Sequence, residues 1–140
     1  VYPFGHGLSY HEWKYSWAAT PWSHKPSTGW PWKCSVSVTA EVIDSAGCTS
    51  RPETSILLFL LPPSAAGPLA PRKALRAFER VSGTKSTVTF DLSDKDFMLA
   101  GADGTFSLVT GTWHAELAKP SALAPRRVEV GKFGCKCDGR

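Results

Sequence analysis

The sequence contains no asparagine and no glutamine, and its longest apolar run covers only residues 56–61. Without asparagine the chain has no N-glycosylation sequon, and side-chain amides cannot contribute to a sugar-binding site. A membrane-spanning helix needs about 20 consecutive apolar residues, far more than this run supplies. We therefore expect no membrane span in this sequence.

Helix signals are also scarce. Eleven prolines and twelve glycines interrupt the 140-residue chain at short intervals, with β-rich runs between them. This pattern is typical of an all-β sandwich that forms one domain. Residues 74–81 fit a helical turn or short extended pieces equally well. The other expected strands cover residues 12–18, 34–43, 55–61, 86–92, 106–109, 112–118 and 127–133. About seven strands of this spacing predict an immunoglobulin-like β-sandwich.

The chain is mildly basic, with a net charge of +4 and basic residues spread along its length. Nucleic-acid-binding proteins usually carry a denser basic stripe or a recognisable module. We therefore interpret the basic residues as a solvated face and expect no nucleic-acid binding. The basic residues that do lie close together are Arg72, Lys73, Arg76 and Arg80, with a further pair at Arg126 and Arg127.

Catalytic chemistry is poorly represented. Asp91, Asp94 and Asp96 are neighbours, but Asp91 and Asp94 fall at a strand end and in a turn, where aspartate normally bonds its own backbone. A glycosidase needs two carboxylates that flank the scissile bond. Cys135 and Cys137 are one residue apart, whereas structural zinc pairs usually have two to four intervening residues. We expect no catalytic residue, no metal and no cofactor in this chain.

Trp22, Trp30 and Trp32 are interleaved with prolines in residues 20–32. Their flat indole rings could form a stacking platform that contacts a carbohydrate or anchors a protein partner. Alternatively, the proline-stiffened loop buries them as a small satellite core against the sandwich. We favour the packing interpretation, because a loop this rich in tryptophan must hide most of it.

Several segments carry a family resemblance. Residues 2–10 (YPFGHGLSY) combine aromatic rings with glycines, as expected for a tight crossing of the backbone. Four more segments follow in a fixed order: residues 55–63 (SILLFLLPP), 71–81 (PRKALRAFERV), 87–97 (TVTFDLSDKDF) and 110–117 (TGTWHAEL). Together they resemble the C-terminal fibronectin type III-like domain of glycoside hydrolase family 3, which includes β-glucosidases and β-xylosidases. The tryptophan-rich loop, the tail and the cysteines depart from the family pattern.

The resemblance implies a division of the chain and a non-catalytic role. Residues 1–11 would be the crossing segment, residues 12–133 the β-sandwich with residues 20–32 as an insertion, and residues 134–140 a cysteine-containing tail. The family carries its catalytic carboxylates in preceding domains, so this chain alone is not expected to be an enzyme. We expect an accessory or interaction domain that stabilises or docks to a larger protein.

The expected partner is either the catalytic domains of a parent glycosidase or a subunit of a larger assembly. The alternative function is a C-terminal fragment of an active β-glucosidase or β-xylosidase. The chain starts at Val1 without a methionine or a signal peptide, so we expect it to be processed or to be a piece of a longer protein. The family resemblance and the cysteines favour an extracellular or secretory location, with an organelle lumen as the alternative.

The cysteine positions favour one disulfide pairing. Cys34 opens the second expected strand, and the last strand ends at the same pole of the sandwich. Cys48 lies beyond the other end of the second strand, and about ten extended residues span roughly 33 Å. A disulfide tolerates a Cα separation of only about 4.4–6.8 Å. We therefore predict that Cys34 pairs with Cys135 or Cys137, and that Cys48 is free or pairs with another chain.

The strand at residues 55–61 is apolar on both faces. Strand residues alternate, so Leu57, Phe59 and Leu61 should share one face and the intervening residues the other. A sandwich covers only one face of each sheet, and a fully apolar strand indicates that both are buried. The cover of the Leu57 face could be the loop at residues 20–32 or a protein partner. We favour a partner.

Overall fold

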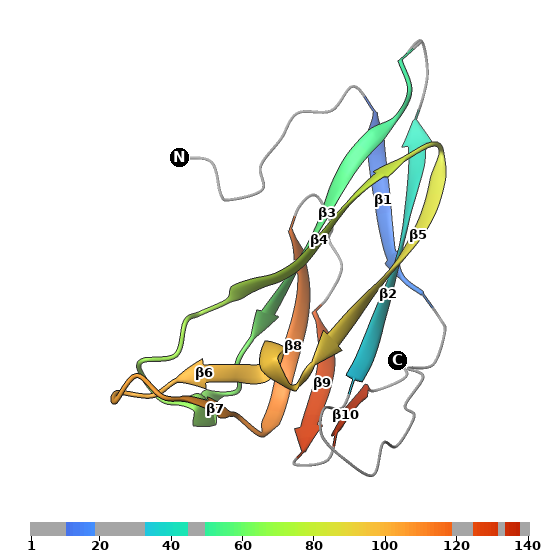
Figure 1. Cartoon of the computed structure of the whole chain (residues 1–140). Helices are drawn as coiled ribbons and strands as arrows, with labels where there is room; N and C mark the ends of the chain where they lie inside the picture. Colours follow the sequence, from blue (N-terminus) through green and yellow to red (C-terminus); the bar gives the residue numbers. More distant parts are fainter. Residues whose placement is uncertain (1–10, 19–32, 45–49, 119–124, 132–133, 138–140) are drawn as a thin grey trace.

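The computed structural model describes residues 11–18, 33–44, 50–118, 125–131 and 134–137. Expectations that concern residues 1–10, 19–32, 45–49, 119–124, 132–133 and 138–140 lie outside these ranges, including those for the crossing segment and for the tryptophan-rich loop. Figure 1 gives the labels of the strands that follow.

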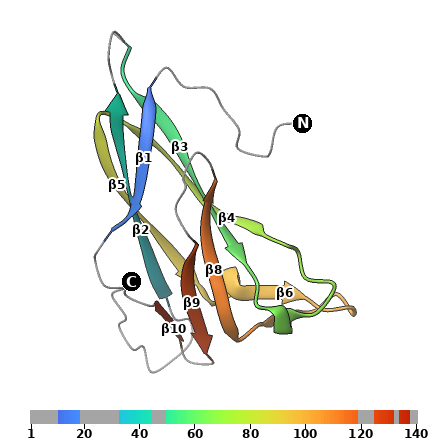
Figure 2. The same cartoon turned by 180° about the vertical axis from the view of Figure 1, so that it is seen from behind.

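Two antiparallel sheets pack face to face, and a short hairpin extends from one end (Figures 1 and 2). The three-stranded sheet has the order β1-β2-β5, with β1 (Glu12–Trp17), β2 (Lys33–Asp44) and β5 (Lys85–Ser93). The five-stranded sheet has the order β10-β9-β8-β3-β4, with β3 (Glu53–Leu61), β4 (Ala74–Ser82), β8 (Gly111–Ala118), β9 (Arg126–Gly131) and β10 (Gly134–Cys137). The hairpin pairs β6 (Met98–Ala100) with β7 (Phe106–Leu108).

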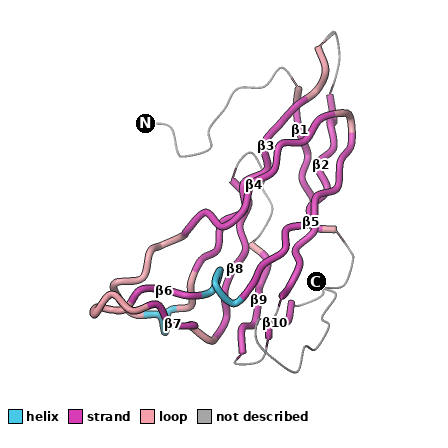
Figure 3. Tube along the Cα trace, viewed as in Figure 1, coloured by secondary structure: helices cyan, strands magenta, loops and turns pink. Residues whose placement is uncertain are grey.

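Helical structure in the described residues is confined to two short 3₁₀ turns, η1 (Ser64–Ala66) and η2 (Asp94–Phe97) (Figure 3). A capping box holds η2: the Ser93 backbone N–H donates to Asp96 Oδ2 at 2.8 Å. The all-β fold expected from the sequence is confirmed.

The core lies between the sheets and follows the alternation of the strands. Every second residue of β2, β3 and β8 points inward, and those in the middle of each strand are buried. Trp113 of β8 is among the largest buried side chains, and its indole N–H donates to the Val109 carbonyl at 2.9 Å. Phe97 meets Trp113 edge to face at a centroid distance of 5.4 Å. Each fully buried aliphatic or phenyl side chain contributes about 1.5–3 kcal/mol, so this core accounts for most of the stabilisation.

Tyr15 links the two sheets through a polar contact. Its hydroxyl lies 2.9 Å from the hydroxyl of Thr54 on β3. Burial raises the pKa of Tyr15, and the hydrogen bond to Thr54 offsets part of that rise. A buried phenol is thereby satisfied without a charge in the core.

The structure settles one open alternative and differs from the expectations in two other segments. Residues 74–82 form strand β4, because they pair with β3 along almost their whole length, and this pairing resolves the helix-or-strand ambiguity in favour of a strand. Residues 134–137, expected in a tail, form β10 and pair with β9. β6 was not expected, because three residues are too few for an alternating pattern to be recognised.

Candidate functional site

The outer surface of the five-stranded sheet carries an apolar patch that we call the apolar face. It consists of Leu57, Phe59 and Leu61 of β3 with Leu75 and Phe78 of β4. The register places Phe78 opposite Leu57 and Leu75 opposite Phe59. Phe78 is 71% exposed and Leu75 is 37% exposed. Because these apolar side chains share one face of neighbouring strands, they form a patch rather than scattered exposures.

β3 divides its apolar residues as the alternation predicts, with one difference. The even-numbered residues from Ile56 to Leu60 are fully buried between the sheets. Leu57 and Leu61 on the other side are half-buried, whereas Phe59 is only 6% exposed. A register irregularity between Leu58 and Phe59 brings Leu75 rather than Arg76 opposite the Phe59 ring.

An ion pair lies over Phe59. The Lys73 Nζ is 4.9 Å from the centre of the Phe59 ring and 2.9 Å from Glu116 Oε1 on β8. Since Phe59 is paired with Leu75 on one side and with Glu116 on the other, the Lys73 side chain crosses above the ring. An ammonium over an aromatic face is attracted by the ring quadrupole. This contact explains how an outward-facing phenylalanine becomes buried within the chain.

The other carboxylates on this face are also paired. Glu53 forms an ion pair with Arg80, and Glu129 lies 3.0 Å from Arg127. The pKa of Glu129 is lowered, chiefly because Thr112 donates a hydrogen bond of 2.7 Å to its carboxylate, with a further contribution from Arg127. Each of the three carboxylates on the outer surface of this sheet, Glu53, Glu116 and Glu129, therefore has a basic partner nearby.

The outer surface of the three-stranded sheet has a different character. Hydroxyl groups of β2 and β5 bond across the strands, Ser37 to Thr89 at 2.8 Å and Thr39 to Thr87 at 3.0 Å. In β2 these residues alternate with buried valines, which is the pattern of a solvated sheet surface. The two outer surfaces thus differ, and only one of them is apolar.

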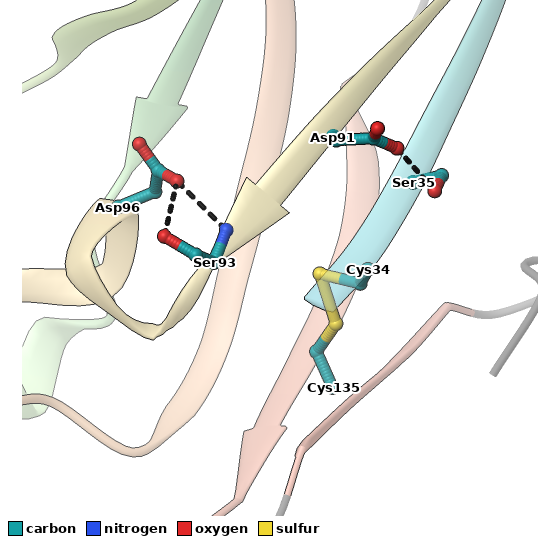
Figure 4. The surroundings of a disulfide bond; sticks show 6 residues. All are labelled: Cys34, Ser35, Asp91, Ser93, Asp96 and Cys135. Carbon is teal, nitrogen blue, oxygen red and sulfur yellow. Dashed lines mark hydrogen bonds between the residues drawn. A yellow bond between two sulfur atoms is a disulfide. The ribbon is translucent and has the colours of Figure 1, made fainter. Parts of the chain in front are cut away.

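The three neighbouring aspartates are not brought together as a catalytic pair. Asp91 accepts a hydrogen bond of 2.8 Å from the Ser35 hydroxyl across the strands, and Asp96 caps η2 (Figure 4). Asp94 is buried, and its Oδ1 has no hydrogen-bond partner. Asp96 does bond a backbone N–H, as aspartate in a turn commonly does, whereas Asp91 bonds a side chain instead.

Cys34 and Cys135 form a disulfide that joins the two sheets (Figure 4). Cys34 lies near the start of β2 and Cys135 lies on β10, with 6.3 Å between their Cα atoms. Each residue is only 3% exposed. This is one of the two pairings that the sequence favoured. Cys137 also lies on β10, while Cys48 and the tryptophans Trp22, Trp30 and Trp32 lie outside the described residues.

The described residues show neither a cluster of candidate metal ligands nor a helix that could span a membrane. These residues contain no group of three or more histidine, cysteine or acidic side chains arranged to hold a metal ion. Within the same part of the chain, none of the helical segments is long and apolar enough to cross a membrane.

Sequence reasoning identified β3 but missed its neighbours on the apolar face. Phe78, Leu75 and Lys73 were all assigned to an ambiguous segment or a basic cluster. The alternation of β4 is interrupted near Arg76, so a strict period of two fails there. Pairing residues 74–82 with β3 would have revealed the apolar residues that the two strands share on this face, because Phe78 then lies beside Leu57.

Comparison with known proteins gives a structural relationship. No protein-family model matches the chain, and no curated protein sequence matches it. A β-glucosidase from Listeria innocua matches 95% of this chain at 26% identity with a TM-score of 0.74, and the match covers 18% of that protein. A β-glucosidase from Erythrobacter marinus matches 90% of the chain at 28% identity with a TM-score of 0.69, covering 16% of its own length.

The same fold occurs in a β-glucosidase from Kluyveromyces marxianus, with 20% identity over 98% of this chain, a TM-score of 0.68 and coverage of 15% of that protein. The chain thus spans less than a fifth of the length of these proteins. It resembles one small β-sandwich domain of family 3 β-glucosidases, consistent with their C-terminal fibronectin type III-like domain.

Proposed function

We propose that this chain is a non-catalytic accessory domain that docks to, and stabilises, a larger protein through its apolar face. The observation that carries the proposal is Phe78, a phenylalanine that is 71% exposed beside the apolar side chains of Leu57 and Leu75. Aromatic side chains are frequent anchors of protein interfaces. Covering one such ring contributes roughly 1.5–3 kcal/mol.

The size of the matched proteins supports a partner of the expected kind. The β-glucosidase from Listeria innocua has more than four-fifths of its chain outside the matched region, since the match covers 18% of it. The candidate partners are the catalytic domains of a parent glycosidase and a subunit of a larger assembly. The Cys34–Cys135 disulfide supports an oxidising location, either extracellular or in an organelle lumen.

A matched pair of substitutions tests the docking surface. Phe78→Ser removes the most exposed ring of the apolar face, and Phe106→Ser removes a ring of similar exposure, 70%, from the hairpin strand β7. Both variants should fold as the isolated chain, because both rings are largely in water. In the native protein that carries this chain, Phe78→Ser should lower the melting temperature or weaken assembly, and Phe106→Ser should not. Equal behaviour of the two variants would refute docking through this face.

A second candidate function is that the chain is the C-terminal piece of an active β-glucosidase. The matches to β-glucosidases favour it, and the two candidates differ in what the native protein contains. Under either candidate the isolated chain should release no product from aryl β-glucosides or β-xylosides. Hydrolysis that disappears on replacing Asp91, Asp94 or Asp96 would overturn the non-catalytic assignment. Hydrolysis by the native protein, but not by the isolated chain, would favour the second candidate.

A further inference from the structure

We infer that the surface that docks onto the apolar face is an apolar protein surface without net charge, and that docking buries the Lys73–Glu116 ion pair. This inference rests on the proposed docking function and specifies the chemistry of its partner. It concerns the five-stranded sheet, where Lys73 crosses Phe59, Leu75 lies opposite Phe59 and Phe78 lies opposite Leu57.

The carboxylates of this face are already paired with basic side chains of the chain. Each of its three carboxylates, Glu53, Glu116 and Glu129, already has a basic partner on the same sheet or at its edge. Binding to an acidic partner would need basic side chains that are available to form new ion pairs. Arg80, Lys73 and Arg127 are each matched within the chain, so an acidic surface would gain little from these three side chains, whereas the exposed Arg72 beside Lys73 forms no ion pair among the described residues. A nucleic acid, whose affinity comes from neutralising phosphates, is disfavoured for the same reason.

The Lys73–Glu116 ion pair lies where a surface docked on the apolar face would approach it. It lies over Phe59, between the half-buried and exposed apolar residues of β3 and β4, so a surface that covers Phe78 and Leu75 also approaches it. In the isolated chain the two side chains are 47% and 30% exposed. An exposed ion pair contributes little to stability. Once water is excluded, removal of one partner leaves a buried uncompensated charge, which is strongly unfavourable.

The occupant is a different protein surface rather than a second copy of this chain. In the matched β-glucosidases the corresponding region makes up 18% or less of the polypeptide, so a neighbouring surface is available within the same protein. A second copy would bring the same pattern of paired charges and would reveal itself as a dimer. Dimer formation by the isolated chain, lost in Phe78→Ser, would therefore overturn this choice of occupant.

Three variants test the buried ion pair. Lys73→Met keeps an unbranched side chain, shorter by one heavy atom, and removes its charge. Glu116→Gln keeps the shape and removes the opposite charge, and the double variant removes both. The readout is hydrogen exchange in residues 74–82, measured in the native protein and in the isolated chain. The difference in protection between the two states reports how tightly the face is covered.

Each single substitution should lower this additional protection by about 30-fold, because one buried charge is left without its partner. The double variant should recover most of the protection. The protection of the wild type should change little between about 0.05 and 0.5 M salt. The substitutions should alter exchange little in the isolated chain, where solvent still reaches both side chains of the pair.

Other outcomes separate failure of the inference from failure of the proposed function. If Lys73→Met weakens protection, Glu116→Gln does not, and protection falls steeply with salt, then Lys73 contacts an acidic partner and the inference is wrong while docking stands. If no substitution changes protection although Phe78→Ser does, the ion pair is not buried and the inference is likewise wrong. If the native protein gives no additional protection of residues 74–82, the proposed docking itself is wrong.

Discussion

Reducing the Cys34–Cys135 disulfide should destabilise the isolated chain more than any single change on its surface. The bond joins residues separated by 101 positions in the sequence and ties β2 of one sheet to β10 at the edge of the other. In the chain-entropy account, closing a loop of about 100 residues stabilises the folded state by about 4.7 kcal/mol, and measured values are commonly lower. We therefore expect a loss of about 3–5 kcal/mol.

The loss should be visible as a large shift in thermal unfolding. For a chain of this length, 1 kcal/mol corresponds to roughly 3 °C, so reduction should lower the melting temperature by about 10–15 °C. The measurement is urea and thermal denaturation of the oxidised and the reduced protein. A background in which Cys48 and Cys137 are replaced by serine leaves only the pair of interest. Cys34→Ala plus Cys135→Ala in the same background serves as a control that is insensitive to reductant.

The location of the change provides a second readout. β10 has four residues and pairs only with β9 among the described strands, so it depends on the disulfide more than longer strands do. After reduction, the amide hydrogens of residues 134–137 should exchange faster than in the oxidised protein. They should also exchange before the amide hydrogens of β3. A shift below about 1 kcal/mol, or a peptide map that links Cys34 to Cys48, would refute the argument that this bond fastens the two sheets.

Three further predictions address the apolar face, the core and a turn. Replacing Phe78 by serine should abolish binding of an apolar dye to the isolated chain, while replacing Phe106 should leave most of it; the reverse order would contradict the assignment of the face. Trp113→Ala should cost about 3–5 kcal/mol in urea denaturation, because the ring is buried against Phe97, and a cost under about 1 kcal/mol would show that the core is loosely packed. The pKa of Asp103 is lowered by hydrogen bonds from Thr105, so its contribution to stability is present above about pH 4 and is lost as the pH falls through the lower folded value. Thr105→Val removes the hydroxyl donor and keeps the backbone N–H, so it should raise that pKa in an NMR titration, and an unchanged titration would exclude the hydroxyl as the main cause.

The sandwich itself could be anticipated because its strands obey simple alternation. The inward valines of β2 alternate with serine and threonine, and this pattern alone separates the core side from the outer side. The position of Cys34 at the start of β2 then placed it at the same pole as the last strand. Both inferences depend on local sequence and on the reversal of direction between antiparallel neighbours.

The composition of the candidate site was harder to anticipate, because it depends on contacts between distant strands. Phe59 reads as one of three equivalent outward residues, yet Lys73 and Glu116, which lie 14 and 57 positions further along the sequence, cover it. The irregularity in the pairing of β3 with β4 shifts Leu75 onto the apolar face. A one-residue shift of this kind reverses which side chains face outward, and a single sequence carries no signal that fixes it.

The mass of the native protein under non-denaturing conditions tests whether this chain acts as a docked part of a larger protein. We expect a species well above the 15.2 kDa of the chain, either as one longer polypeptide or as a complex, in which residues 74–82 are protected from hydrogen exchange relative to the isolated chain. A native protein that is a 15.2 kDa monomer, with the same exchange in these residues as the isolated chain, would contradict it.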